Sequence, residues 1–412
     1  MKVLWFEVTK PAGYSESNQV IGGWQDSLES IVKASKDIEL NVAFASDQEL
    51  PTKNEAGVTY IPICAKQNFI QRLRSIASWG ATAEVLVHGA LKTVEDVKPD
   101  IIHVFGLEWP WGLLSHYTQI PVVIHIQGSM VPYLNALYPP KYNLSNYVKT
   151  YFPNILKIFA YYLSARKQTS RMMMEKEVWK CVKNYMGRTD WDYALSRVMA
   201  PNSRYWHVDE ALRPVFLEQQ EPHNHFDGKI RIMSTGCGTF WKGPDMLLKT
   251  AKILKDSGVD FEWKVAGEMQ DSVKKLVEKT EHLRFEDCNV SILGFQSPSD
   301  LIDLMKSSSI YVHTAYIENS PNSICEAQCL GLPVISTNVG GISTLVIHEE
   351  DGILVPANDP WQMAFNIVDL YSDKKRYQQM SERSRIKALH RHSADKLLSE
   401  LKTCYNDILK EK

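Results

Sequence analysis

The chain has 412 residues, of which 44% are hydrophobic and 23% charged, and this is enough to form two separately cored domains. Its formal net charge of -2 excludes a global electrostatic field of the kind that points to nucleic acid or to a membrane surface. Apolar runs stay shorter than the roughly 18 residues that a membrane-spanning helix needs, so the sequence predicts no such helix.

The N-terminal residues and the cysteines both bear on cellular location. MKVLWFEVTK leads directly into a strand-like run and does not resemble a secretory signal. The seven cysteines include no CxxC pair and no zinc-ligand spacing. An odd number of cysteines without a signal segment indicates reduced thiols. We therefore expect a cytoplasmic protein.

The first part of the chain alternates between strand-like and helix-like segments. Strands are expected at residues 2–8, 41–45, 58–62, 101–105 and 122–126, and helices at residues 24–34 and 81–97. Such alternation predicts right-handed βαβ units and a parallel sheet with helices on both faces. The carboxyl ends of these strands form one sheet edge, which is where ligands bind in such sheets.

Two loops at this edge are candidate ligand contacts. Gly22 and Gly23 lie between the first strand and the next helix, where glycines let the backbone approach a ligand, although a simple turn explains them equally well. Gln127 and Gly128 end a later strand. His125 precedes Gln127 by two residues, and for it a packed sheet histidine is the favoured interpretation.

Residues 141–188 form a basic segment that is rich in aromatic residues and methionine. They hold ten Lys or Arg against two acids, a balance of +8. This combination predicts docking on an anionic membrane or binding of a lipid-pyrophosphate acceptor. A solvated basic face over an ordinary hydrophobic helix face explains it equally well. Nucleic acid fits less well, because no recognised binding motif accompanies the charge.

Asp190 and Asp192 form an Asp-Trp-Asp sequence that matches the Asp-x-Asp pattern of metal-dependent GT-A transferases. There, paired carboxylates hold a divalent ion on the diphosphate. Here the pair precedes a helical stretch at residues 193–199, and helix capping is the favoured interpretation.

Residues 201–228 contain three prolines and one glycine and are the expected linker. Strand and helix patterns then alternate again from residue 229, which predicts a second, independent Rossmann-like sheet. The expected domains are therefore residues 1–207 and residues 208–385, with residues 386–412 forming a C-terminal helix.

The first loop of the second sheet has the sequence TGCGTFWKG over residues 235–243. It matches neither G-x-G-x-x-G nor a P-loop, because no Lys-Ser/Thr follows its last glycine. The loop nevertheless has the features that bind a diphosphate, namely glycines, the lysine Lys242 and a helix that starts directly after it. We expect Lys242 to bind phosphate rather than to be an ordinary surface lysine.

The most informative stretch is ENSPNSICEAQCLGLPVISTNVGG, which runs from Glu318 to Gly341. A buried strand is expected before it, and a short helix is expected to start within it. Seven residues separate Glu318 from Glu326. A carboxylate can accept hydrogen bonds from two adjacent sugar hydroxyls, so one of them could hold a sugar ring and the other a ribose. The free backbone N–H groups of Asn322, Ser323 and Ile324 at the helix start would suit a phosphate or sugar hydroxyls.

This run resembles the E-x7-E motif of the retaining GT-B glycosyltransferases of family GT4. The resemblance implies an α/β protein of GT-B architecture, with two Rossmann-like parallel-sheet domains facing each other across a cleft. It assigns the donor sugar to Glu318 and the ribose to Glu326. It also implies that the C-terminal helix returns to the N-terminal domain.

The same resemblance supplies further site residues. Lys242 and Gly243 match the Lys-Gly of the family's diphosphate loop, whereas Cys237 or Gly238 stands where the family has an arginine. Glu318 and Lys242 are the expected catalytic residues. The expected donor-binding residues are Gly22, Gly23, Gln127, Arg188, Gly238, Lys242, Gly267, Phe295, Glu318, Asn319, Ser320, Pro321, Asn322, Ser323 and Glu326.

The implied reaction transfers a sugar, with retention of configuration, from a nucleotide-diphosphate donor to a glycan or lipid-linked acceptor in bacterial capsule, O-antigen or exopolysaccharide synthesis. No cofactor and no metal are expected, because the sugar nucleotide is a substrate and fixed positive groups stabilise its diphosphate. The expected partners are the donor and the acceptor, together with a peripheral membrane contact at the inner face of the plasma membrane through residues 141–188.

Three other classes remain open. A sugar-nucleotide epimerase can share the GT-B build, and interconversion of sugars without an acceptor would distinguish it. A non-catalytic sugar-nucleotide-binding protein would explain the missing arginine of the diphosphate loop. A GT-A enzyme would depend on a metal held by Asp190 and Asp192.

Overall fold

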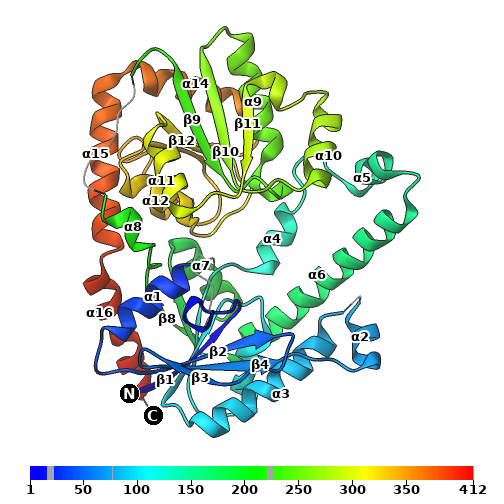
Figure 1. Ribbon diagram of the computed structural model, residues 1–412, viewed down its shortest axis with the longest axis vertical. Coiled ribbons are helices and arrows are strands. Elements are labelled where there is room, and N and C mark those ends of the chain that lie inside the picture. Colours follow the sequence, from blue (N-terminus) through cyan, green and yellow to red (C-terminus); the bar gives the residue numbers. More distant parts are fainter. Residues whose placement is uncertain (16–22, 77, 220–225, 412) are drawn as a thin grey trace. The chain divides into compact units, whose positions relative to one another are not determined.

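The computed structural model describes residues 1–15, 23–76, 78–219 and 226–411. These residues group into two compact units. The first unit comprises residues 1–134, 156–211 and 392–412, and the second comprises residues 135–155 and 212–391. Each unit is built on its own sheet (Figure 1).

In the described part of the chain, the sheet of the first unit has eight strands in the order β3-β4-β2-β1-β5-β6-β7-β8. All neighbouring pairs are parallel except β3 and β4. The strands are β1 (Lys2–Glu7), β2 (Glu39–Ser46), β3 (Lys53–Glu55), β4 (Val58–Cys64), β5 (Ile101–Phe105), β6 (Val122–His125), β7 (Asn184–Gly187) and β8 (Arg204–His207). Because the central strands are buried on both faces, they have the continuous apolar sequence expected of a parallel sheet.

Helices cover both faces of this sheet. On one face, α1 and α16 contribute Leu28 and Leu401 to the core, and on the other, α3 and α6 contribute Leu86 and Trp179. The helices are η1 (Ala12–Tyr14), α1 (Trp24–Lys33), α2 (Phe69–Ser75), α3 (Gly80–Val97), η2 (Pro110–His116), α4 (Met130–Ala136), α6 (Ile155–Cys181), α7 (Asp190–Met199) and α16 (Ala394–Leu409). Helices α4 and α6 each cross a boundary between the units, at residues 134/135 and 155/156.

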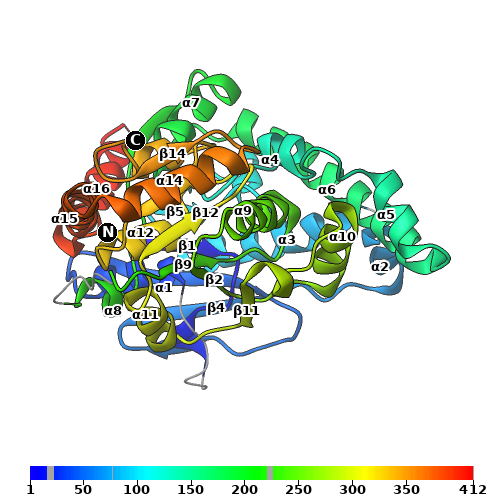
Figure 2. The same cartoon turned by 90° about the horizontal axis from the view of Figure 1, so that it is seen from above.

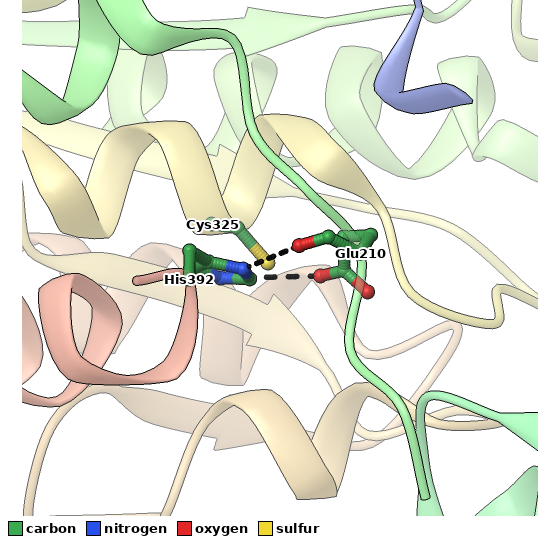
Figure 3. Close-up of side chains that lie close together, drawn as sticks. All are labelled: Glu210, Cys325 and His392. Carbon is green, nitrogen blue, oxygen red and sulfur yellow. Dashed lines mark hydrogen bonds and ion pairs between the residues drawn. The ribbon is translucent and has the colours of Figure 1, made fainter. Parts of the chain in front are cut away.

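The last 21 residues of the chain complete the first unit. The hydroxyl of Tyr405 on α16 accepts a hydrogen bond from Trp5 Nε1 at 3.0 Å and lies 2.6 Å from His103 Nδ1. At the start of this segment, the buried ring of His392 places Nδ1 2.9 Å from the main-chain oxygen of Glu210 and Nε2 3.9 Å from its Oε1 (Figure 3). These contacts attach the C-terminal segment to strands and loops that precede it by between 182 and 400 residues.

The described part of the second unit holds a six-stranded, all-parallel sheet in the order β11-β10-β9-β12-β13-β14. Figure 2 shows helices on both sides of its strands. One core lies under α9, α10 and α14, and another under α8, α11 and α12. The strands are β9 (Ile230–Thr235), β10 (Phe261–Ala266), β11 (Val290–Gly294), β12 (Ile310–His313), β13 (Val334–Thr337) and β14 (Ile353–Val355). The helices are α5 (Leu144–Tyr151), α8 (Pro214–Leu217), η3 (Phe240–Lys242), α9 (Pro244–Asp256), α10 (Asp271–Glu281), η4 (Glu286–Cys288), α11 (Pro298–Lys306), α12 (Asn322–Cys329), α13 (Ile342–Leu345), α14 (Pro360–Ser372) and α15 (Lys374–Arg391).

Residues 135–155 group with the second unit, whereas the sequence analysis placed them in the N-terminal domain. Tyr142 is buried in the core under α9 and α10 and donates a hydrogen bond to Glu281 Oε1 at 2.9 Å. The rings of Tyr138 and Tyr142 lie 6.0 and 5.7 Å from the ring of Phe240 in η3. The units divide after residues 211 and 391, compared with expected divisions after residues 207 and 385.

Within the described residues, no helix combines the length and the apolar character that crossing a bilayer would require.

Candidate functional site

The loop after β9 is held in a shape that requires glycine. Gly243 caps α9 with a φ of +70°, and a Cβ placed there would lie 1.9 Å from the main-chain oxygen of Thr314. The Thr314 hydroxyl donates to the main-chain oxygen of Lys242 at 3.0 Å, and the Tyr316 N–H donates to that of Trp241 at 2.7 Å. The loops after β9 and β12 are therefore joined to each other at the carboxyl edge of the second sheet, which is where ligands bind in parallel sheets.

Glu318 lies in the loop after β12 and is 8% exposed. Its carboxylate accepts a hydrogen bond from Lys242 Nζ, and its Oε2 also lies 3.6 Å from His313 Nε2, too far for a hydrogen bond. Its main chain packs on Gly340 (φ +54°), where a Cβ would lie 1.9 Å from the Glu318 oxygen. The Gly341 N–H donates to that same oxygen at 3.0 Å. The two residues expected to be catalytic are thus in direct contact.

The charge of Glu318 is set by its neighbours. Burial alone would raise the pKa of Glu318, but the attraction of Lys242 lowers it to about 2. Burial lowers the pKa of His313, so the imidazole is neutral at pH 7. Glu318 is therefore a carboxylate over the whole physiological pH range. Both described contacts of this carboxylate are made by its Oε2 atom.

Glu326, on α12, has a different environment. It is 3% exposed, and its Oε1 accepts hydrogen bonds from Arg213 Nε at 2.9 Å and Nη2 at 2.6 Å. Burial raises the pKa of Glu326 and the attraction of Arg213 opposes this shift. The sequence analysis missed Arg213, because no local pattern connects residues 113 positions apart.

The start of α12 offers fewer free N–H groups than the sequence analysis expected. The N–H of Ile324 donates to the main-chain oxygen of Pro321 at 3.0 Å, so it is not available to a ligand. Asn319 and Ser320 are buried, whereas Asn322 and Ser323 are partly exposed.

The glycine loops after β10 and β11 border this region of the second sheet. Gly267 has a φ of +100° and donates its N–H to the oxygen of Gly294 at 2.7 Å. A Cβ at Gly238 would lie 2.5 Å from the main-chain oxygen of Glu268, so a larger residue would displace that loop. Phe295 is 67% exposed and is not a packed core phenylalanine.

The remaining expected donor contacts belong to the first unit. Gly23 is the N-cap of α1 and is exposed, and Gly22 lies outside the described residues. The main-chain oxygen of Gln127 accepts a hydrogen bond from Arg188 Nη2 at 2.9 Å. Arg188 itself is 4% exposed, and its guanidinium lies 5.2 Å from the centroid of the Trp24 ring. These contacts fix the loop after β6 and leave little of Arg188 exposed.

His125, Asp190 and Asp192 have structural partners. His125 is buried, its Nε2 lies 3.0 Å from the main-chain oxygen of Val208, and burial together with Arg188 lowers its pKa to about 3. Asp190 is the first residue of α7. Asp192 completes a capping box with Thr189, and its Oδ2 accepts from the Arg188 N–H at 2.8 Å. The Asp-Trp-Asp sequence therefore begins and caps a helix, as the sequence favoured.

Glu108, after β5, is a buried acid that the sequence analysis did not single out. A Cβ at Gly106 would lie 2.3 Å from its Oε2, and one at Gly128 would lie 3.1 Å from its Oε1, so the carboxyl group fills the space beside two glycines. Burial raises the pKa of Glu108 to about 7, and the carboxylate of Glu175 acts in the same direction. The only signal in the sequence was its position just beyond the end of a predicted strand.

Glu108→Gln should change how stability depends on pH. A carboxyl group whose pKa is raised on folding stabilises the fold below about pH 4.5, and this contribution is lost as the pH rises through about 7. Glutamine resembles the protonated acid and does not titrate. The free energy of unfolding of the variant, relative to that of the parent, should therefore rise by about 3 kcal/mol between pH 4 and pH 8. Urea unfolding at both pH values measures this. Glu177→Gln on the exposed side of α6 should follow the parent, and parallel profiles for parent and Glu108→Gln would refute the assignment.

Comparisons with known proteins bear on the second unit. Residues 215–387, which lie inside it, match the family described as "Glycosyl transferases group 1". A Haemophilus influenzae protein described as an uncharacterized glycosyltransferase is 30% identical over 174 residues, which cover 42% of this chain and 47% of that protein. The Staphylococcus aureus capsular polysaccharide biosynthesis glycosyltransferase CapM is 27% identical over 170 residues, covering 41% and 44%. The chain therefore spans about half the length of the curated relatives it matches.

Solved structures resemble the whole chain. Sucrose-phosphate synthase from Thermosynechococcus elongatus superposes with a TM-score of 0.74 at 14% identity, over 100% of both chains. HepE of Anabaena, solved in complex with UDP-glucose, superposes with a TM-score of 0.63 at 17% identity, over 98% of this chain and 99% of its own. The chain has a GT-B fold. This confirms the predicted fold class. At sequence identities this low, the similarity to these structures shows the fold alone.

Proposed function

We propose that the protein is a retaining glycosyltransferase that moves a sugar from a nucleoside-diphosphate donor to a glycan or lipid-linked acceptor. The observation that carries the proposal is the buried contact between Glu318 and Lys242 at the carboxyl edge of the second sheet. A permanently charged carboxylate can accept hydrogen bonds from sugar hydroxyls, and the lysine beside it can form an ion pair with a diphosphate. The glycosyltransferase family match over residues 215–387 supports this reading.

In the proposed reaction, the bond between the anomeric carbon and the diphosphate oxygen breaks, the bond from that carbon to the acceptor hydroxyl oxygen forms, and the proton of the acceptor hydroxyl passes to the departing diphosphate. Negative charge develops on the leaving diphosphate, and the Lys242 ammonium stabilises it without a metal ion. Glu318 accepts hydrogen bonds from the sugar hydroxyls through Oε1, because the hydrogen bond from Lys242 is made to Oε2. The acceptor attacks from the side that the diphosphate leaves, so the anomeric configuration is retained.

The relatives support a class of donor and a cellular setting for the proposed reaction. HepE was solved with UDP and with UDP-glucose, and an Escherichia coli relative, 31% identical over 121 residues, is a UDP-galactose-dependent galactosyltransferase acting on a diphosphoundecaprenol-linked sugar. We therefore include UDP-sugars as donors, bacterial surface polysaccharide as the pathway and the cytoplasm as the location. The seven free cysteines support that location.

Donor binding is tested by thermal melting in the presence of UDP-glucose, UDP-galactose, UDP-N-acetylglucosamine and GDP-mannose. A donor at about 100 times its dissociation constant stabilises the protein by about 2.7 kcal/mol, which raises the melting temperature of a unit of this size by about 5 °C or more. The shift should disappear in Glu318→Ala and persist in Glu286→Gln, a change to an exposed acid of the same unit. A panel in which none of the four donors shifts the parent protein would reject the proposal.

The diphosphate loop favours one alternative, a protein that binds a sugar nucleotide without transferring the sugar. Residues 235–243 carry Lys242 as their sole charge, and Cys237 is a buried thiol whose pKa is raised by burial to about 12. Slow release of the nucleoside diphosphate from the bound donor, measured without acceptor, separates the two. Binding with no release identifies the alternative.

A further inference from the structure

Helix α2 exposes an apolar stripe to solvent. It has no buried residue, and Phe69, Ile70 and Leu73 are 75%, 68% and 54% exposed, as is Ile76 just beyond its end at 51%. Residues 69, 73 and 76 follow an i, i+4, i+7 spacing, so these side chains share one face of the helix. Contiguous exposed apolar side chains of this kind mark an interaction surface, whereas single ones need no explanation.

The first half of α6 continues this pattern within the same unit. Leu156, Phe159 and Tyr162 are 82%, 58% and 52% exposed. The chain that follows α2 is attached to α6 further along, where the Trp79 N–H donates to Ser170 Oγ at 3.0 Å. Both views place α2 and the first half of α6 on the same side of the first unit (Figures 1 and 2). We refer to residues 66–76 and 156–171 together as the docking surface.

All charged residues of the docking surface are basic. Its two stretches contain Lys66, Arg72, Arg74, Lys157, Arg166, Lys167 and Arg171 and no acidic residue, in a chain whose net charge is -2. Arg171 is turned inward, since its Nη2 donates to the main-chain oxygen of Glu108, and Arg74 has a partner 3.7 Å away in Glu84. Lys167 Nζ lies 5.4 Å from the centroid of the Trp79 ring, and the remaining basic residues alternate in sequence with the exposed apolar ones. Exposed aliphatic and aromatic side chains interspersed with Lys and Arg match the interface of an anionic bilayer, where apolar groups enter the acyl boundary and cations bind phosphate groups.

We propose that the docking surface binds the protein peripherally to bilayers that contain anionic phospholipid. The sequence pointed to residues 141–188 as a whole. The structure narrows the contact to the first half of α6 and adds α2, which lies outside that segment. Membrane docking is independent of donor binding, so the two proposals fail separately.

Co-sedimentation with vesicles tests the proposal on the full chain. The parent protein should bind vesicles of phosphatidylcholine containing about a third phosphatidylglycerol, and bind vesicles of phosphatidylcholine alone at least about tenfold more weakly. Each basic residue near an anionic surface strengthens binding about fivefold, so Lys157→Gln/Arg166→Gln should weaken binding at least about tenfold. Phe69→Ser/Leu73→Ser should weaken it by a similar factor, with an unchanged melting temperature because both side chains are exposed.

Helix α14 provides the matched control. Trp361 and Phe365 are 70% and 64% exposed and four residues apart, but α14 contains no Lys or Arg. Trp361→Ser/Phe365→Ser should therefore bind anionic vesicles like the parent. Hydrogen exchange with vesicles present should slow at residues 69–76 and 156–162. The proposal would be overturned if the parent protein bound no vesicles, or bound both vesicle types equally. It would also be overturned if the α14 variant weakened binding as much as the α2 variant, or if the protected amides lay elsewhere.

Discussion

Lys242→Met is expected to slow release of nucleoside diphosphate from the bound donor by about a hundredfold or more. Removing one preorganised group that stabilises the charge developing on a leaving group lowers the rate by roughly 10²- to 10³-fold. Lys242 is the sole charged residue of residues 235–243, so no neighbour in this loop can replace it. The change also removes the cation that keeps the pKa of Glu318 at about 2. The variant therefore affects both the leaving group and the carboxylate proposed to bind the sugar.

Two variants make this prediction specific. Lys252→Met removes another lysine of the same unit that pairs with an acid, Asp256, but on an exposed helix surface, and it should leave the rate unchanged. Lys242→Arg keeps the positive charge and should recover part of the rate, although the broader guanidinium does not fit the same contact. The measurement is diphosphate release at saturating donor, with the donor chosen by its melting shift. A Lys242→Met rate within about threefold of the parent would remove Lys242 from the mechanism.

Several features of the site were predictable because they are local. Glycine at residues 243 and 340 is required by positive φ and by carbonyl oxygens only 1.9 Å from where a Cβ would lie, and both glycines stand out in the sequence. Glu318 was identified by the run that begins with it, which resembles the E-x7-E motif, and Lys242 by the Lys-Gly match of its loop. Both residues follow predicted strands, and the carboxyl ends of parallel strands share one edge. Their direct contact follows from the two loops being neighbours in the strand order.

The misses arose from contacts between distant parts of the chain. Residues 135–155 are aromatic and irregular in sequence, and nothing local shows that Tyr142 is buried against helices that begin about 100 residues later. Helix α2 was not predicted, and its sequence does not show that its apolar residues are exposed, because they look like those of a core helix until burial is known. Glu108 required knowledge of which glycines lie beside its carboxyl group. Periodicity predicts elements, and packing decides which side chains are buried.

Arg213→Met is expected to destabilise the second unit by about 3 kcal/mol, because it leaves the carboxylate of Glu326 buried without a cation. Burial already raises the pKa of Glu326, and Arg213 is what opposes that shift. In the variant the pKa of Glu326 should therefore rise further. A carboxyl group with a raised pKa in the folded state stabilises at low pH and loses this contribution as the pH rises, so the deficit should be small near pH 4 and full at pH 8.

Hydrogen exchange of α12 measures this loss in the unit concerned, which avoids assuming that the two units unfold together. Arg213→Met/Glu326→Gln should recover most of the stability, because the uncompensated charge is gone and the remaining amide costs less to bury. Arg231→Met breaks a pair with Asp227 on the surface of the same unit and should cost no more than about 1 kcal/mol. If the double variant is no more stable than Arg213→Met, the loss comes from the packing of the arginine side chain and not from its charge. Donor binding is then compared between the double variant and Arg213→Met, which keeps the carboxylate. The sequence resemblance assigns a ribose contact to the Glu326 carboxylate, so binding that is kept in Arg213→Met and lost in the stable double variant would support that role.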